Sequence, residues 1–212
     1  MFSIMAGEIM PPRPKFTKED MIKAAFDITC ELGIGAVTAR QVGEKLGTSV
    51  SPIFACFSGM DELRAEVLKM AWSSFCGYLE ESDICSPSFK ARILQTIRFA
   101  QDEPRLFQAL FMAEQKAADF AEQMKMNSAI SEADIESIQS EYGISESDAN
   151  RLLRHIRAEA FGICALCAVS ACSFSASELE SFVSEAFEDA ALAAAHRTGN
   201  AVPVRAENGG LK

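Results

Sequence analysis

Few side chains in this sequence have the types and the spacing that catalysis requires. The 212 residues include only two histidines, His155 and His196. His155 lies beside Arg154 on a polar helix face, and His196 lies near a helix C-terminus, where a cation interacts favourably with the helix dipole. A nucleophile elbow, a zinc-protease motif, a Walker loop and a dinucleotide-binding glycine motif are all missing. We therefore predict no catalytic residue, no metal and no cofactor; an enzyme that uses His155 or Cys164 is an alternative.

The seven cysteines do not form a recognisable metal or disulfide pattern. Cys164 and Cys167 match C-x-x-C, but a zinc site needs about four ligands and the sequence offers no second Cys/His pair at a suitable spacing. The pair lies inside the apolar run 161–171, where cysteine behaves as a small hydrophobic residue. The odd number and the scatter of the cysteines predict reduced thiols in the cytoplasm.

Composition excludes several classes of protein. With 49% hydrophobic and 24% charged residues, the chain is neither disordered nor collagen-like. It lacks the run of roughly 18 uncharged apolar residues that a membrane span needs and a basic start typical of a secretory signal, so we expect a soluble cytoplasmic protein. The net charge is −10. Residues 1–70 hold 8 basic and 9 acidic side chains and residues 71–212 hold 12 and 21, so the N-terminal third is the part that can face phosphate.

Helical signals dominate, and they begin with three short helices. Thr17 has an acid three residues later, which predicts a helix start, and Gly33 predicts its end. Thr38 has the spacing of a capping box, and Gly47 stops the helix that follows. Ser49 is the expected cap of a third helix.

The remainder of the chain is also predicted to be helical, with the segment 116–128 ambiguous between helix and loop. Ser177, with an acid three residues on, is the expected cap of the last helix. Strand patterns are nearly absent, so the predicted fold class is all-α. The expected helices after the first three span 61–82, 88–103, 104–113, 131–143, 145–171 and 177–196.

The segment from Thr38 to Phe57 reads as a cap, a short helix, a glycine turn and a second short helix. This is the pattern of a helix-turn-helix, whose second helix enters the major groove of DNA. An ordinary helical hairpin inside a bundle fits the spacing equally well. The inward positions are Val42, Leu46, Ile53 and Phe57. The outward positions of the second helix are mainly Val50, Ser51, Pro52, Ala55 and Cys56.

Residues 21–68 resemble the N-terminal domain of the tetracycline-repressor (TetR) family. The resemblance is carried by 21–27 (MIKAAFD), 31–33 (ELG), 37–47 (VTARQVGEKLG), 53–57 (IFACF) and 60–63 (MDEL). It implies a homodimeric transcriptional regulator, a repressor, that a small molecule releases from double-stranded operator DNA. The implied parts are a helix-turn-helix DNA-binding domain with an arm at 1–60, a helical regulatory and dimerisation domain at 61–197 and a flexible tail at 198–212. The helices at 145–171 and 177–196 would form the dimer interface.

The predicted DNA-binding surface departs from the family pattern at three positions. Phe54, Cys56 and Met60 stand where the family usually has tyrosine, histidine and lysine, and 46–60 contains no charged residue. Because affinity for DNA rests largely on phosphate neutralisation, we predict weak or strongly salt-sensitive binding in which few counterions are released. Arg13 and Lys15 lie in a proline-rich arm that can reach along the duplex, and Lys45 is also near. The DNA-binding candidates are Thr38, Arg40, Gln41, Thr48, Ser49, Val50, Ser51, Pro52, Phe54, Ala55, Cys56 and Met60.

Methionine and phenylalanine are frequent in 99–112, which suits either an ordinary core or the lining of an apolar cavity. We predict a cavity for an unidentified effector, with a preference for an apolar or aromatic compound. The candidate ligand-binding residues are Trp72, Phe75, Phe99, Phe107, Phe111, Met112 and Phe161. The alternative function is a dimeric ligand- or partner-binding protein of the same fold whose DNA binding is weakened or lost.

Overall fold

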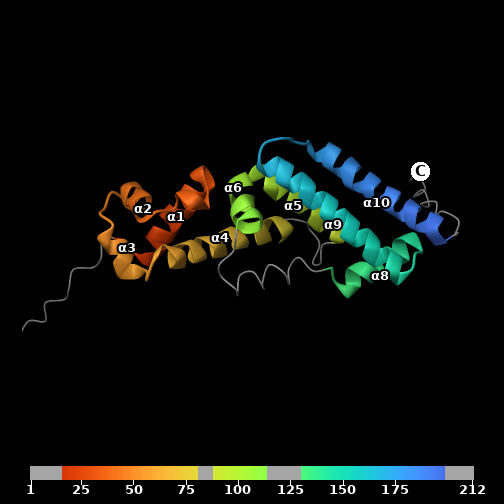
Figure 1. Ribbon diagram of the computed structural model, residues 1–212, viewed down its shortest axis with the longest axis horizontal. Helices are drawn as coiled ribbons and strands as arrows, with labels where there is room; N and C mark the ends of the chain where they lie inside the picture. The colour runs from red at the N-terminus through yellow and green to blue at the C-terminus, as the bar shows by residue number, and fades with distance from the viewer. Residues whose placement is uncertain (1–15, 81–87, 114–129, 199–212) are drawn as a thin grey trace, which may run out of the picture.

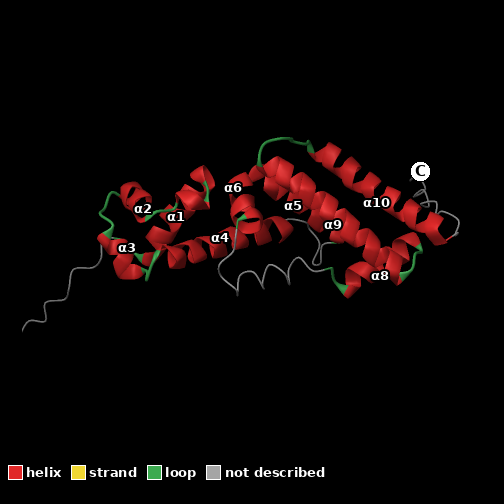
Figure 2. Cartoon of the chain, viewed as in Figure 1, coloured by secondary structure: helices red, strands yellow, loops and turns green. Residues whose placement is uncertain are grey.

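The computed structural model of the chain describes residues 16–80, 88–113 and 130–198. Within these ranges every regular element is a helix, which confirms the predicted fold class (Figure 2). None of the described helices is long and apolar enough to cross a bilayer. The molecule is elongated, with the first three helices at one end and the last two long helices at the other (Figure 1).

Three helices and a short 3₁₀ turn form the N-terminal end of the molecule. They are α1 (Lys18–Leu32), η1 (Ile34–Ala36), α2 (Ala39–Leu46) and α3 (Ser51–Cys56). The Thr17 hydroxyl accepts from the Asp20 N–H at 3.1 Å, as predicted, and Gly33 ends α1 at a positive φ of 86°. Their inner faces meet in a core that includes Met21, Ile28, Val37, Val42, Ile53 and Phe57.

The C-terminal helices enclose a second, larger core. They are α4 (Met60–Glu80), α5 (Phe89–Asp102), α6 (Pro104–Phe107), the π-helical turn η2 (Gln108–Met112), α8 (Glu132–Tyr142), α9 (Glu146–Ala168) and α10 (Ala176–Thr198). The first half of α4 contributes Leu63 and Val67 to the N-terminal core, and its second half contributes Trp72 and Phe75 to the larger one. One helix therefore joins the two cores.

Two predicted helix caps are wrong. The prediction that Ser49 caps α3 fails because Val50 occupies the cap position without a side-chain hydrogen bond. With Ser49 as the cap, Pro52 would be the third helical residue, and proline has no N–H to donate to the serine oxygen. The prediction that Ser177 caps the last helix is also wrong: the Ser175 hydroxyl accepts from the Glu178 N–H at 3.3 Å, so α10 begins two residues earlier.

Two other predicted helices end or divide differently. The single helix expected at 104–113 changes from α-helix to π-helix after Phe107. The helix expected to reach 171 ends at Ala168, because Ser170 adopts a left-handed conformation with φ 58°. The predicted ambiguous segment 116–128, the arm with Arg13 and Lys15, and positions 199–212 of the predicted tail lie outside the described residues.

Candidate nucleic-acid interface

Local sequence signals build the unit formed by α2, its turn and α3. The Thr38 hydroxyl accepts from the Gln41 N–H at 3.2 Å, which fixes the start of α2. Gly47 ends α2 in the left-handed region at φ 66°, a conformation that costs glycine little. The Thr48 N–H donates to the Gly43 carbonyl at 2.9 Å, so the turn folds directly back on α2. With Val42 and Ile53 fully buried, the two helices are held at a fixed angle.

The outer face of α3 is open to solvent and largely apolar. Phe54 and Val50 are 55% and 41% exposed, well above the usual exposure of large apolar side chains in a core. Phe54 therefore belongs to the outward face, although helical spacing had not included it among the main outward positions. Of the other DNA-binding candidates, Thr38, Arg40, Gln41, Ser49, Ser51 and Ala55 are exposed, and Thr48, Pro52, Cys56 and Met60 are half-buried.

Every lysine and arginine between residues 16 and 70 lies within ion-pair distance of a carboxylate. Arg40 donates to Glu44 at 2.8 Å, and Lys45 donates to Glu31 at the same distance. The pairing raises the pKa of Arg40 and of Lys45, chiefly through these hydrogen bonds. The cations expected near phosphate thus already have intramolecular partners, and an exposed pair of this kind is worth only about 0–1 kcal/mol.

Glu62 connects the start of α4 to α1, a role that the sequence analysis missed. Lys18 Nζ donates to Glu62 Oε1 at 2.8 Å, and the N–H and hydroxyl of Ser58 donate to Oε2 at 2.8 and 2.9 Å. The hydrogen bond from Lys18, followed by those from Ser58, lowers the pKa of Glu62 to about 2. Serine four residues before glutamate at a helix start was the only local signal, because Lys18 is distant in sequence.

A second ion-pairing side chain, Arg64, ties α4 to the beginning of α2. Its guanidinium donates to the Val37 carbonyl at 2.9 Å and to Asp61 at 3.1 Å. Val37 immediately precedes Thr38, the residue that caps α2. The position of the helix-turn-helix is therefore fixed by polar contacts to α4 as well as by its core.

Most of the predicted ligand-binding residues gather in one aromatic cluster. Phe75 packs against Phe99, Phe111 and Trp72 with ring centroids 5.1, 5.2 and 5.3 Å apart. Phe107 stacks on Phe111 at 4.8 Å. Phe161 lies at the edge of the cluster, 6.0 Å from Phe107 and 47% exposed. Met112, at the end of η2, is also partly open to solvent, with 46% of its surface exposed.

Comparison with known proteins identifies the fold but no close sequence relative. The sequence matches no protein-family profile and no curated protein. A crystal structure of a TetR-like transcriptional regulator from Rhodococcus sp. RHA1 aligns with a TM-score of 0.61 over 83% of this chain and 96% of that one, at 13% identity. The chain has the TetR-like fold. A transcriptional regulator from the same organism aligns with a TM-score of 0.60 over 86% and 97%, at 17% identity.

In this TetR-like chain the buried thiols are not activated for catalysis. Burial raises the pKa of Cys164 to about 12 and that of Cys167 to about 11. Both are therefore protonated at neutral pH, so neither supplies the thiolate that attack on an external substrate needs. Among the described residues, no group of three or more metal-binding side chains is close enough to hold an ion.

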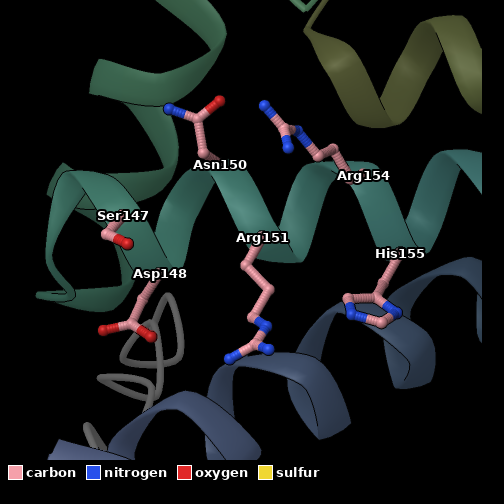
Figure 3. Close-up of a pocket in the computed structure, with 6 residues that line it drawn as sticks. All are labelled: Ser147, Asp148, Asn150, Arg151, Arg154 and His155. Carbon is pink, nitrogen blue, oxygen red and sulfur yellow. The ribbon is translucent and has the colours of Figure 1, made fainter.

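His155 lies in a shallow depression on the TetR-like chain's helix α9 (Figure 3). The depression has a volume of about 490 Å³ and is lined by Ser147, Asp148, Asn150, Arg151, Arg154 and His155. Arg151 and His155 point to one side of α9, while Asn150 and Arg154 point to the other. Arg151 and Arg154 place two positive side chains at this depression.

Proposed function

We propose that this chain is a DNA-binding transcriptional regulator, most simply a repressor, that inserts α3 into the major groove. The observation that carries the proposal is the exposed outer face of α3 on a helix-turn-helix whose inward side chains Val42, Ile53 and Phe57 are buried. In this proposal residues 1–60 are the DNA-binding head and 61–197 the regulatory domain. The two Rhodococcus proteins of the same fold are described as transcriptional regulators, which supports the same function.

The chemistry of α3 favours apolar readout of the bases. Val50, Pro52 and Ala55 can contact thymine methyl groups in the major groove, and Ser51 and Thr48 can hydrogen-bond to base edges. Phosphate contacts fall to Thr38 and Arg40 and to main-chain N–H groups, because α3 itself carries no charge. Each missing charge-assisted contact costs about 1.5–3 kcal/mol of gross binding energy, so affinity is modest.

The proposed dimer forms through α9 and α10. Phe161 and Leu166 are large apolar side chains exposed on the second half of α9, Val169 is exposed immediately after this helix, and Leu192 is exposed on α10. Such a patch is typical of an interface between subunits. A two-fold axis that packs the two helix pairs against each other would bury it and place the two heads on the same side of DNA.

Charge is distributed along the α9–α10 pair in a way that supports an antiparallel dimer. Arg197 lies 3.5 Å from Asp148, so the C-terminus of α10 is beside the N-terminus of α9. Exposed Arg151 and Arg154 lie in the first half of α9, near this contact, and exposed Glu178 and Glu185 lie in the first half of α10, towards the opposite end. A two-fold axis across the middle would bring these arginines of one subunit near these glutamates of its partner.

The proposed effector is an apolar or aromatic small molecule that inserts among the rings of the aromatic cluster. The cluster is linked to the head through α6, which contacts both α1 and α9. Gln108 Nε2 also donates to the Ala168 carbonyl at 2.6 Å and so joins η2 to the end of α9. Release of DNA requires the effector to favour one separation of the two heads by about 1–3 kcal/mol.

Titration of the purified protein with duplexes from the DNA beside its own gene tests the proposal. Fluorescence anisotropy between about 50 and about 300 mM salt gives the number of phosphate contacts. For each contact, the logarithm of the binding constant falls by about 0.9 for every tenfold rise in salt concentration. Arg40→Ala should reduce the slope by about 1 per half-site. Lys69→Ala is the matched control: Lys69 is also exposed and paired within its helix, but lies about 14 Å along α4 from Met60. A slope that implies about eight or more contacts per half-site would contradict the weak-binding interpretation.

A second function is supported by the uncharged α3 and the paired cations. In this alternative the chain is a dimeric ligand- or partner-binding protein that keeps the TetR-like fold without controlling a gene. Selection from a library of genomic fragments at about 50 mM salt separates the two functions. Enrichment of a discrete sequence supports the regulator, and recovery of no fragment by a folded dimer supports the alternative.

A further inference from the structure

Two cysteine side chains meet where α9 turns into its connection to α10. The sulfur atoms of Cys167, in the last turn of α9, and Cys172, in the connection, are 3.7 Å apart. Cys167 is 3% exposed, and Cys172 is half-buried. Both are free thiols in this structure.

The backbone between the two cysteines is shaped to bring them together. Ser170 is the only described non-glycine residue with a positive φ, at 58°, a conformation that costs an ordinary side chain energy. Ser170 N–H donates to the Cys167 carbonyl at 2.8 Å, and Ala171 N–H donates to the Leu166 carbonyl at 2.9 Å. These bonds reverse the chain within five residues and direct Cys172 back onto the end of α9.

We propose that Cys167 and Cys172 form an oxidisable dithiol, which hydrogen peroxide converts into an intrachain disulfide. The Cys172 sulfur, the more accessible of the two, attacks the peroxide oxygen; the O–O bond breaks and leaves a sulfenic acid and water. The Cys167 sulfur then attacks the Cys172 sulfur and displaces hydroxide, which takes the Cys167 proton and leaves as a second water. Two thiols are oxidised by two electrons, and one molecule of hydrogen peroxide is reduced.

Formation of the disulfide would change the position of the connection between α9 and α10. A disulfide needs its sulfurs about 2.05 Å apart, so the connection must approach α9 from the present 3.7 Å. Gln101 of α5 holds this connection: its amide donates to the Phe174 carbonyl and accepts from the Phe174 N–H, both at 2.9 Å. The Cys167 thiol also points at Gln101 Oε1 from 3.9 Å. Oxidation would remove the Cys167 thiol proton and move the connection between α9 and α10, which Gln101 of α5 also holds.

Burial of Cys167 also sets the order of the steps. It raises the pKa of Cys167 to about 11, so this thiol is protonated and sheltered until the sulfenic acid has formed beside it. A high-pKa thiol is a poor leaving group, so the disulfide, once formed, is reduced slowly by attack at Cys172. The inference rests on the two sulfurs and their turn and not on DNA binding, so it can fail while the proposed function stands.

Mass spectrometry of the full-length protein tests the pair directly. Trypsin releases residues 158–197 as one peptide, which contains Cys164, Cys167 and Cys172. After treatment with hydrogen peroxide, unfolding and alkylation with N-ethylmaleimide, this peptide should carry two fewer labels than in the untreated protein. Reduction before alkylation should restore both.

Variants assign the partners and keep the test decisive. Cys172→Ser and Cys172→Ala should both abolish the loss of labels, whereas Cys164→Ser should still lose two. If Cys164→Ser instead prevents the loss, Cys164 is a partner and the inference is wrong. Retention of all three labels, or conversion to sulfinic acid without a disulfide, at peroxide doses that oxidise free dithiothreitol would also overturn it.

Discussion

A methyl group added at Gly43 should displace the turn between α2 and α3. A Cβ at this position would lie 2.9 Å from the Thr48 carbonyl oxygen and 3.5 and 3.6 Å from backbone atoms of Ser49. Because the obstructing atoms belong to the main chain of a tight turn, they cannot rotate away as a side chain would. Overpacking of this kind costs about 1–3 kcal/mol. Weakening of the hydrogen bond from Thr48 to Gly43 adds about 0.5–1.5 kcal/mol.

Against this cost, alanine in place of glycine gains about 1 kcal/mol of helix propensity. The net expectation for Gly43→Ala is a loss of about 2 kcal/mol, or about 4–8 °C in melting temperature for a chain of this size. Gly77→Ala is the matched control, because Gly77 lies in α4 with no atom within 4 Å of an added Cβ. It should raise the melting temperature by about 2–4 °C. Thermal denaturation followed by circular dichroism measures both; equal stabilisation by the two substitutions would refute the close approach of turn and helix.

Three further substitutions test the electrostatics of the head. The pKa of Glu62 is lowered to about 2, chiefly by the hydrogen bond from Lys18. The ionised carboxylate therefore stabilises the fold fully above about pH 4.5, and this stabilisation is lost as pH falls towards 2. Glu62→Gln should make the free energy of unfolding depend less on pH, measured by urea denaturation from pH 5 to pH 2. Phe54→Tyr restores a phosphate-directed hydroxyl and should tighten DNA binding by about 3–10-fold, or about 0.5–1.5 kcal/mol, in the anisotropy assay; unchanged affinity would mean that residue 54 does not face the backbone. Glu44→Gln frees Arg40 and should also strengthen DNA binding, with a steeper salt dependence.

The local part of this fold was predictable and the long-range part was not. The caps at Thr17 and Thr38 were correctly predicted because each depends on residues within one helical turn. The choice between Ser175 and Ser177 was not local: both have glutamate three residues on. Gln101 holds the main chain of Phe174 with two hydrogen bonds, and Ser175, the next residue, caps α10.

The ion pairs of the head show the same limit. The sequence placed Lys45 and Arg40 near phosphate, and the structure gives each an acidic partner. Arg40 and Glu44 are four residues apart on one helix, so that pair was visible in the sequence. Lys45 and Glu31 are 14 residues apart on different helices and meet only because α1 packs against α2. The DNA-binding role of these residues stays a prediction, and the pairing of Lys45 with Glu31 could not be predicted from local sequence.

The connection between the two cores limits how the head can move. Val67 and Trp72 belong to different cores but lie five residues apart on α4, about 7.5 Å along one continuous helix. α1 provides a second connection, because Phe26 packs against both cores and α6 contacts α1. Two attachments prevent the head from turning freely about α4. We therefore expect a compound that separates the rings around Phe75 to shift α4 and α6 together and to carry α3 with them.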